Sequence, residues 1–311
     1  MRALLNAILL LSGIVSVAAH ARQDAGPTDV GDSIVVEGRK MTPKEVREGA
    51  TGFVRTLGVV QGDQSVARWQ SPICPAVLGV PEDVAQIAES KVRAIIEDVK
   101  APLAKPGCDA NLLIAFVEDG RDLMKLVAYR RPKLLYQMQG PDRRNLVDGD
   151  APIRWWHVTG SGTGGGSPSG GAPSPATGGN TEGGGSILPD GVAGSSSYSS
   201  SLIRPPVTRS FSVATVIIDV HRAEGITLSE AAAYATFVGL AEVRDSADPP
   251  VASILNLFKD GQHPGGLTFW DRQFLTELYE LPLNRFGRVQ RGHLIKGLVE
   301  GGHAPVKEEA P

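Results

Sequence analysis

Two histidines and one glutamate occupy positions that a strand, a turn and a helix would bring to one end of a sheet. His157 lies in the run 153–159, His221 follows the apolar run 211–220, and Glu230 opens the next segment. Imidazole and carboxylate groups bind zinc and exchange protons near neutral pH. His157, His221 and Glu230 are therefore the candidates for a metal site or an acid/base pair. The alternative is structural, because Glu230 also occupies the acid position of a capping box and histidines at strand ends are usually surface residues.

Established catalytic motifs do not accompany these three residues. The sequence contains no H-E-x-x-H, H-x-x-E-H, G-x-S-x-G, S-x-x-K with its partner motifs, or G-x-x-x-x-G-K-[ST]. Residues 160–165 match G-x-G-x-x-G, but no helical pattern follows, and dinucleotide binding through that loop requires one. The sequence predicts no cofactor and favours a protein that is not an enzyme.

Four aromatic residues are candidates for contact with a ligand or partner. Trp155 and Trp156 are adjacent in a predicted strand, so their side chains point to opposite faces of the sheet. Both are expected to be buried. If one is exposed beside Tyr234 or Trp270, it would contribute to a binding surface.

The two cysteines, Cys74 and Cys108, favour a disulfide. They are the only cysteines in the chain, and an even count is typical of exported proteins that form such a bond. Two buried free thiols are the alternative. A metal site on the cysteines is disfavoured, because there is no C-x-x-C and no histidine lies near either one.

The first residues have the pattern of a secretory signal. Arg2 provides a positive charge, residues 4–17 are mainly apolar, and Ala19-His20-Ala21 is a small-x-small cleavage pattern. We expect cleavage after Ala21, no transmembrane segment after that cleavage, and a periplasmic or secreted protein. An uncleaved membrane anchor is the alternative. Residues 22–40 are expected to form a flexible leader that ends in a strand-like run, 33–40.

Helical and strand patterns alternate through the rest of the chain. Two capping boxes, Thr42–Glu45 and Thr227–Glu230, mark helix starts, and Thr268 has an acid at the same spacing. The predicted helices begin at 42, 81, 122, 227 and 268, with a last helix around 294–299, and the predicted strands are 111–117, 153–159 and 211–220. The expected fold class is α+β, with a small mixed sheet packed by several helices.

A change of composition interrupts this pattern. Residues 160–204 are rich in Gly and Ser and carry few charges, so they bury too little apolar surface to offset the entropy of ordering. We expect a single domain over 41–300 with 160–204 as a long disordered insertion, and a tail at 301–311. The strands that flank the insertion would pair as a hairpin. Two lobes, 41–159 and 205–300, are the alternative.

The overall charge excludes one class of partner. The net charge of the 311-residue chain is -3, with 31 Lys and Arg against 34 Asp and Glu. Nucleic-acid-binding domains usually carry a clear basic excess. We therefore expect no nucleic-acid partner.

Four segments together resemble a known group of proteins. They are CPAVLGV (74–80), CDANLLIAFVED (108–119), the stretch 216–243 and LTFWDRQFLTELY (267–279). They resemble an uncharacterised family of exported alphaproteobacterial proteins over about residues 34–300. The strand, turn and helix around 216–243 are remotely similar to a domain-of-unknown-function family with a zincin-like, zinc-metallopeptidase fold. In that family this helix would carry metal ligands; here it reads Glu230-Ala231-Ala232-Ala233-Tyr234, so the resemblance implies a scaffold without them.

Two functions follow from these observations. The first is a non-catalytic envelope protein that binds or scaffolds an envelope protein or a small ligand. The alternative is a secreted, peptidase-like hydrolase with an atypical or degenerate site, built on His157, His221 and Glu230. Convergence of these three residues in a cleft would favour the hydrolase, and their separation would favour binding.

Overall fold

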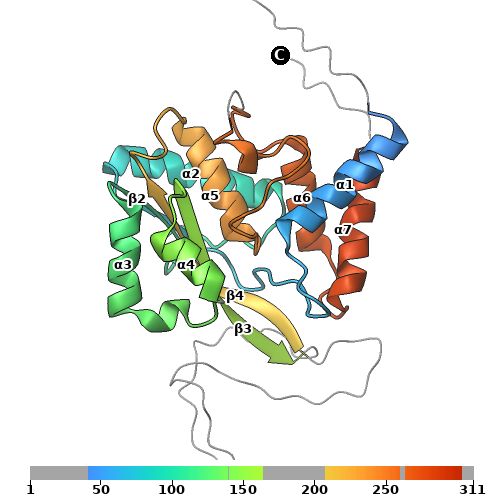
Figure 1. The fold of residues 1–311 in the computed structure, drawn as a ribbon, viewed down its shortest axis with the longest axis horizontal. Helices are drawn as coiled ribbons and strands as arrows, with labels where there is room; N and C mark the ends of the chain where they lie inside the picture. Colours follow the sequence, from blue (N-terminus) through green and yellow to red (C-terminus); the bar gives the residue numbers. More distant parts are fainter. Residues whose placement is uncertain (1–40, 139, 164–206, 260–262, 303–311) are drawn as a thin grey trace, which may run out of the picture. The chain divides into compact units, whose positions relative to one another are not determined.

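A computed structural model describes residues 41–138, 140–163, 207–259 and 263–302. The expected signal peptide, the leader with its strand-like run 33–40 and most of the Gly/Ser-rich segment and tail lie outside these residues. Figure 1 shows one sheet with helices on both of its faces. The elements, in chain order, are α1 (Pro43–Leu57), β1 (Pro75–Leu78), α2 (Glu82–Asp98), β2 (Leu112–Val117), α3 (Gly120–Arg130), η1 (Pro132–Leu135), α4 (Gly140–Asp148), β3 (Ile153–Thr163), β4 (Val207–Asp219), α5 (Leu228–Leu240), η2 (Ile254–Asn256), α6 (Phe269–Glu280) and α7 (Gly287–Gly301).

The sheet has four strands in the order β1-β2-β4-β3. The first three strands are parallel, and β3 runs antiparallel to β4 at the edge. The fold is therefore α+β with a mixed sheet packed by helices, as the sequence predicts. β3 and β4, which flank the Gly/Ser-rich segment, pair from Ile153↔Ile218 to Thr163↔Val207.

The helices divide between the two faces of the sheet. The larger core lies on the face covered by α2 and α5, and it extends to α1, α6 and α7. The smaller core lies on the other face and contains Met124 of α3, Leu135 of η1 and Leu146 of α4, packed against Trp156 and Ile217. Consecutive crossovers thus go to opposite faces, because α2 joins β1 to β2 on one side and α3 follows β2 on the other.

Three helices begin with the same reciprocal hydrogen bonds. In each, the threonine side chain accepts from the backbone N–H three residues later, and the acid accepts from the threonine N–H, which satisfies donors that a helix start leaves free. The pairs are Thr42–Glu45, Thr227–Glu230 and Thr268–Asp271. These capping boxes fix where α1, α5 and α6 begin, in agreement with the sequence.

Cys74 and Cys108 form the expected disulfide, with their Cα atoms 5.9 Å apart. Cys74 immediately precedes β1, and Cys108 lies shortly before β2. The bond therefore joins the chain just before β1 to the chain just before β2, at the start of these two parallel strands.

Several boundaries differ from the sequence prediction. β3 continues through residues 160–163, which were expected to begin the disordered insertion, because they pair with residues 207–210 of β4. The same pairing makes the G-x-G part of the 160–165 match a strand and not a phosphate-binding turn. β1 and α4 were not predicted: β1 has four residues, and α4 has the single buried residue Leu146.

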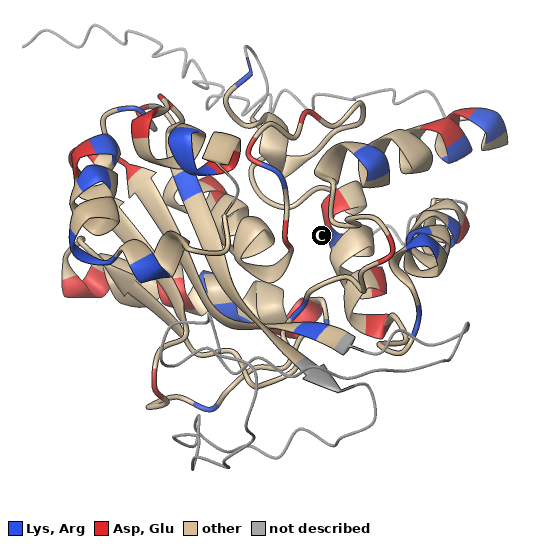
Figure 2. Cartoon of the chain, turned by 60° about the horizontal axis from the view of Figure 1, so that its bottom comes forward, with Lys and Arg blue, Asp and Glu red and all other residues tan. Residues whose placement is uncertain are grey.

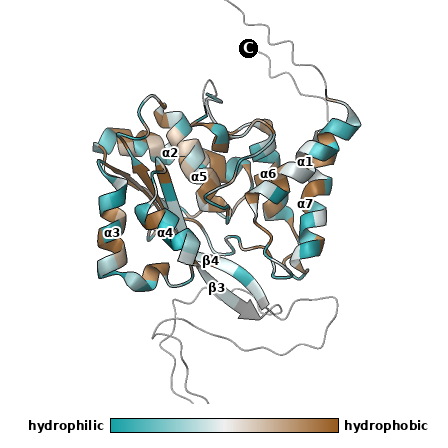
Figure 3. Cartoon of the chain, in the orientation of Figure 1, coloured by the Kyte–Doolittle hydropathy of each residue, from teal (hydrophilic) through white to brown (hydrophobic). Residues whose placement is uncertain are grey.

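The exterior carries both signs of charge. Figure 2 shows Lys and Arg close to Asp and Glu on the same helices. Figure 3 shows hydrophobic residues on the inner part of the sheet and on α5, with hydrophilic stretches on α1, α7 and the outer part of β4. Among the described residues, no helix is both long enough and apolar enough to cross a bilayer.

Candidate functional site

A cavity of about 890 Å³ runs along β3, the edge strand of the sheet. We call it the β3 groove. One wall comes from the α4 region and includes Gln137, Met138, Asp142, Asn145 and Leu146. The other comes from α5 and the segments after α1 and α5, and includes Val60, Gln61, Tyr234, Glu242, Val243, Asp245, Ser246, Leu255 and Phe258. Residues 153–157 and Thr159 of β3 form its floor.

The outer edge of β3 presents unpaired backbone groups to this groove. Asp219 donates its N–H to the carbonyl of Pro152 at 2.9 Å across the two strands. Backbone groups of an antiparallel pair alternate in direction. Counting from Pro152, every second residue of β3 therefore bonds to β4, and the residues between them, including Trp155 and His157, direct their N–H and C=O groups outward. No hydrogen bond in the described part of the chain reaches those outward groups.

Gln137 closes one end of this free edge. Its side-chain amide donates to the carbonyl of Thr159 at 2.8 Å and accepts from the Thr159 N–H at 2.8 Å. These are the two bonds that a neighbouring strand would make with an outward-facing residue. Gln137 therefore substitutes for a strand at Thr159 and leaves the edge from Ile153 to His157 open.

Arg154 lies at the other end of the groove, and its guanidinium has unused donors. The residue is 2% exposed, although it is charged. Its Nη2 donates to the carbonyl of Gly149 at 2.5 Å, whereas Nε and Nη1 have no partner among the described residues. Burial lowers the pKa of Arg154. Buried donors without acceptors are costly, so this arginine marks a place where an anion would be stabilised.

Arg154 approaches the start of α3 closely. Its Nη1 lies 2.7 Å from the point where residue 120 would carry a Cβ atom, and that residue is Gly120. The Gly120 N–H donates to Asp219 Oδ2 at 3.0 Å. Glycine at this position therefore leaves room for the guanidinium against the helix start.

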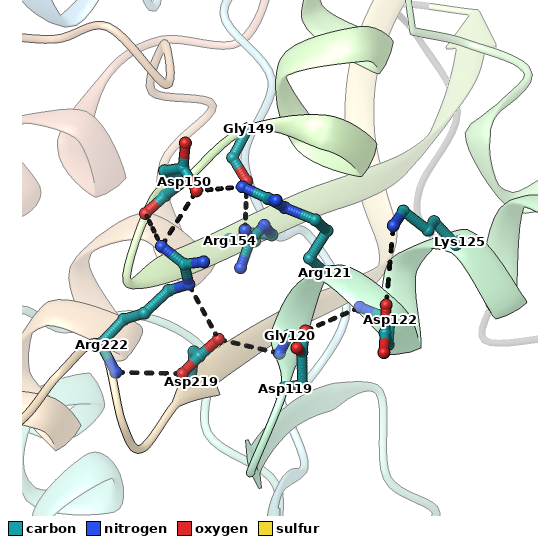
Figure 4. A network of polar contacts seen from close by, with 10 residues as sticks. All are labelled: Asp119, Gly120, Arg121, Asp122, Lys125, Gly149, Asp150, Arg154, Asp219 and Arg222. Carbon is teal, nitrogen blue, oxygen red and sulfur yellow. Dashed lines mark hydrogen bonds and ion pairs between the residues drawn. The ribbon is translucent and has the colours of Figure 1, made fainter.

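Two more arginines complete the cluster and hold Asp150 between them (Figure 4). Asp150 forms an ion pair with Arg121 of α3 and another, at 3.0 Å, with Arg222 in the turn after β4. Its side chain is 74% exposed. Beneath it, buried Asp219 accepts from the Arg222 N–H at 3.0 Å and lies 3.4 Å from Arg222 Nε. We call Arg121, Arg154 and Arg222 the arginine cluster.

The topology of the sheet explains why these groups meet. Arg121 follows β2, Arg222 follows β4, and Arg154 is at the start of antiparallel β3. All three therefore lie at the carboxyl edge of the parallel strands. Because α3 and α5 leave this edge on opposite faces, it is a topological switch point, where open α/β sheets commonly bind ligands.

Two polar contacts shape the middle of the groove. Arg209 and Glu242 form a bidentate ion pair, with both N–O distances 2.7 Å. Asn145 of α4 donates to Asp245 at 3.1 Å and so connects the two walls. These contacts fix the relative position of β4, α4 and the segment after α5.

The four candidate aromatic residues are buried, and three of them line the groove. Trp155 belongs to the larger core and Trp156 to the smaller one, so they do point to opposite faces. Trp155 contacts Tyr234 edge to face, with ring centroids 6.0 Å apart. Trp155, Trp156 and Tyr234 line the groove, whereas Trp270 packs against Phe53 away from it.

His157, His221 and Glu230 are not gathered into one site. His157 is paired with Ala214, five residues before Asp219 at the end of β4, which places it about 16 Å along the strand from the turn that contains His221. Glu230 accepts from Thr227 and from the Gly265 N–H and is 3.8 Å from His263. Among the described residues, no group of three or more His, Cys, Asp and Glu side chains could hold a metal ion.

His157 is a neutral, partly buried ring in the groove floor. It stacks on Phe211 with ring centroids 4.3 Å apart. Desolvation lowers its pKa to about 4, although Glu242 opposes the shift. Its Nε2 is buried without a hydrogen-bond partner in the described structure. Such a histidine is a weak base and is suited to packing or to accepting one hydrogen bond.

Sequence reasoning missed the arginine cluster and Asp150. One signal was available: Arg154 interrupts the apolar run Ile153-Arg-Trp-Trp156, and a charged residue within such a strand requires a compensating environment. Arg121, Asp150 and Arg222 carried no comparable signal, because their proximity depends on strand order.

Comparison of the chain with protein-family models, with curated proteins and with solved structures finds no match. The likeness to exported alphaproteobacterial proteins therefore stays a prediction, and function is inferred from the β3 groove and its arginine cluster.

Proposed function

We propose that this protein is a non-catalytic binding protein of the bacterial envelope and that the β3 groove holds its ligand. One observation carries the proposal. The groove combines a volume of about 890 Å³ with the buried Arg154, whose Nε and Nη1 have no partner among the described residues. Ligand pockets are typically apolar clefts of this size with a few well-placed polar groups.

The other side chains of the groove support binding over catalysis. Arg209 is neutralised by Glu242, and Asn145 bonds to Asp245. A general base is most effective when its pKa is near the working pH, and the pKa of His157 is about 4. These groups shape and line the groove, whereas the aromatic rings of Trp155, Trp156 and Tyr234 provide its apolar surface.

The envelope location is supported by two features. The N-terminal residues have the signal pattern described above, and Cys74 and Cys108 form a disulfide, which persists mainly in oxidising compartments. Fractionation of cells that express the full chain, with mass spectrometry of its N-terminus, tests this. We expect a periplasmic or secreted protein that begins at Arg22. An intact N-terminus in the cytoplasmic fraction would contradict the location.

A fragment screen by ligand-observed NMR tests the groove without assuming a ligand. The library contains small carboxylates, amides and aromatic compounds, and the protein is the exported chain. Ser246→Trp places a large side chain on the groove wall at an exposed position. Ser90→Trp makes the same change at an exposed position of α2 that does not line the groove.

We expect fragments to bind the wild type and Ser90→Trp and to lose most of their signal with Ser246→Trp. Small carboxylates should be enriched among them because of the arginine cluster. Fragment binding that is equal in all three proteins would show that the groove is not the binding site. An absence of fragment binding to the wild type would reject the proposed function.

A further inference from the structure

We propose that the ligand is an extended peptide that adds to the open edge of β3 as an antiparallel strand and places its C-terminal carboxylate on the arginine cluster, where it replaces Asp150. This inference rests on the proposed function and specifies the chemistry of its ligand. It combines two features that meet in one groove: an unpaired strand edge and a cluster of cations at the end of that edge.

The edge of β3 supplies the backbone half of the recognition. Trp155 and His157 direct their backbone N–H and C=O groups outward, and these backbone groups have no hydrogen bond in the described chain. A peptide that adds to a sheet edge satisfies such groups with its own backbone, and its alternate side chains enter pockets on either side. From Ile153 to His157 the edge is about 13 Å long, which is room for about five peptide residues.

Gln137 limits the site at one end. Its amide already occupies the outward groups of Thr159 with two bonds of 2.8 Å. A bound strand must therefore stop before Thr159 or displace this side chain. The peptide N-terminal part lies at this end, and longer chains continue past it into solvent.

The arginine cluster supplies the charged half and fixes the direction. It lies at the start of β3, so a carboxyl terminus bound there makes the peptide run antiparallel to β3. Arginine presents several N–H donors in a planar arrangement that matches a carboxylate. An internal Asp or Glu side chain provides the same group, and the test below separates it from a chain terminus.

Asp150 already occupies the position that we assign to the ligand carboxylate. It lies between Arg121 and Arg222, and its side chain is 74% exposed. Ion pairs of exposed groups contribute little to stability, so Asp150 can leave for water at small cost. Its departure leaves three arginines facing Asp119 and Asp219, and this excess of positive charge favours an incoming anion.

Apolar side chains flank both sides of the open edge. Trp155 and Tyr234 lie on the side of the larger core, and Trp156 and Leu146 lie on the side of the smaller one. Alternate side chains of an added strand point to these two sides. We therefore infer that the peptide has apolar residues near its C-terminus.

Affinity selection with a pool of hexapeptides that have apolar last residues tests the proposal. Each recovered peptide is synthesised as the free acid, as the C-terminal amide, and as the amide with a penultimate Asp. Binding is measured by calorimetry with the wild type, Asp150→Asn, Asp148→Asn and Arg222→Met, because Arg222 is one of the two arginines that hold Asp150. Asp148→Asn is the control, because it makes the same charge change at an exposed residue of α4 that does not line the groove.

We expect the free acid to bind at least tenfold more tightly than either amide. Asp150→Asn should raise the affinity for the acid severalfold, because the competing carboxylate is gone, whereas Asp148→Asn should leave it unchanged. Arg222→Met should reduce the affinity for the acid toward that for the amide. In hydrogen exchange, the bound acid should protect the amides of Trp155 and His157 in the wild type and in Asp150→Asn.

The remaining outcomes separate this inference from the proposed function. Equal binding of acid and amide, or no gain in Asp150→Asn, would overturn the carboxylate anchor. If the penultimate-Asp amide binds as tightly as the free acid, the arginine cluster recognises an acidic side chain and not the chain terminus. That result would overturn the antiparallel direction assigned to the peptide. Peptide binding without protection at Trp155 and His157 would overturn strand addition.

If fragments bind the groove but no peptide binds, this inference is overturned and the proposed function still stands. If neither binds, both fail. A third outcome would show instead that a second copy of the chain occupies the edge of β3. In that case the molecular mass of the wild type in solution rises with protein concentration, whereas Ser246→Trp keeps the mass of a monomer.

Discussion

The roles of three polar residues follow from their positions along the outer edge of β3. Gln137 satisfies the edge at Thr159, and Arg154 is buried at its opposite end. His157 lies between them and is kept neutral by its surroundings. Each of these residues has a polar group in largely apolar surroundings. Such a group stabilises the fold only if it has a hydrogen-bond or charge partner.

His157 should make the stability of the protein depend on mildly acidic pH. The unfolded chain takes up this proton near pH 6.5, whereas the folded protein takes it up only near pH 4. Between these values the unfolded state binds more protons, so the free energy of unfolding falls as the pH falls, by up to about 3 kcal/mol. Urea denaturation at intervals from pH 7 to 4 measures this decrease.

The matched variants are His157→Gln and His221→Gln. His221 is exposed in the turn after β4, so its replacement should leave the pH dependence as in the wild type. His157→Gln should flatten the curve between pH 6.5 and 4. If both variants keep the wild-type slope, burial of His157 is not its source.

At the scale of elements, the same capping box begins three helices, but the box is exposed in one helix and its acid is buried in the other two. The capping box of α1 is exposed, whereas the acids of the other two boxes, Glu230 of α5 and Asp271 of α6, are buried. Asp271 also accepts from Ser253 Oγ at 2.6 Å and from the Ile254 N–H at 2.7 Å, and so connects η2 to α6.

Removal of the acid should therefore cost far more in α6 than in α1. Glu45→Ala is expected to lower the free energy of unfolding by about 1 kcal/mol, as for an exposed cap. Asp271→Ala leaves several buried donors without an acceptor and is expected to cost more than about 3 kcal/mol. Urea denaturation of the two variants checks the difference, and equal losses would refute the role assigned to burial.

The elements with strong local signals were predicted from the sequence, and the others were not. Capping boxes located α1 and α5, and apolar runs located β2 and β4. α4 buries one side chain, and β1 is too short to show a periodicity, so neither had a signal. The continuation of β3 into Gly160–Thr163 depends on hydrogen bonds to β4, which composition does not report.

The candidate site was the least predictable part, for a related reason. The direction of each N–H on β3 depends on its register with β4, and the meeting of the three arginines depends on the order of strands in the sheet. The aromatic residues of the groove were identified because Trp155 and Trp156 are conspicuous in sequence. Asp150 was not, because an exposed aspartate in a loop is ordinary.

At the scale of the whole molecule, the disulfide and the groove belong to opposite edges of the sheet. The bond joins the segments that precede β1 and β2, and β3 forms the far edge. A cross-link across 34 residues limits the unfolded chain and stabilises the folded one by about 3–4 kcal/mol in the chain-entropy description.

Replacement of both cysteines by alanine should lower the free energy of unfolding by about that amount. Fragment binding in the groove should be unchanged at temperatures where the variant remains folded. Denaturation and the NMR screen, run on the same sample, check both statements. A loss of binding in the folded variant would show that the two edges are coupled.

The pairing of Thr163 with Val207 has a consequence for the gene. Thr163 and Val207 are paired across the two strands, so a connecting segment of any length that can reverse the chain direction can join them. Each doubling of the length of that segment lowers the free energy of unfolding by only about 0.6 kcal/mol. The gene can therefore lose or gain codons between these two positions with little effect on folding, so homologues should differ most in length at this point.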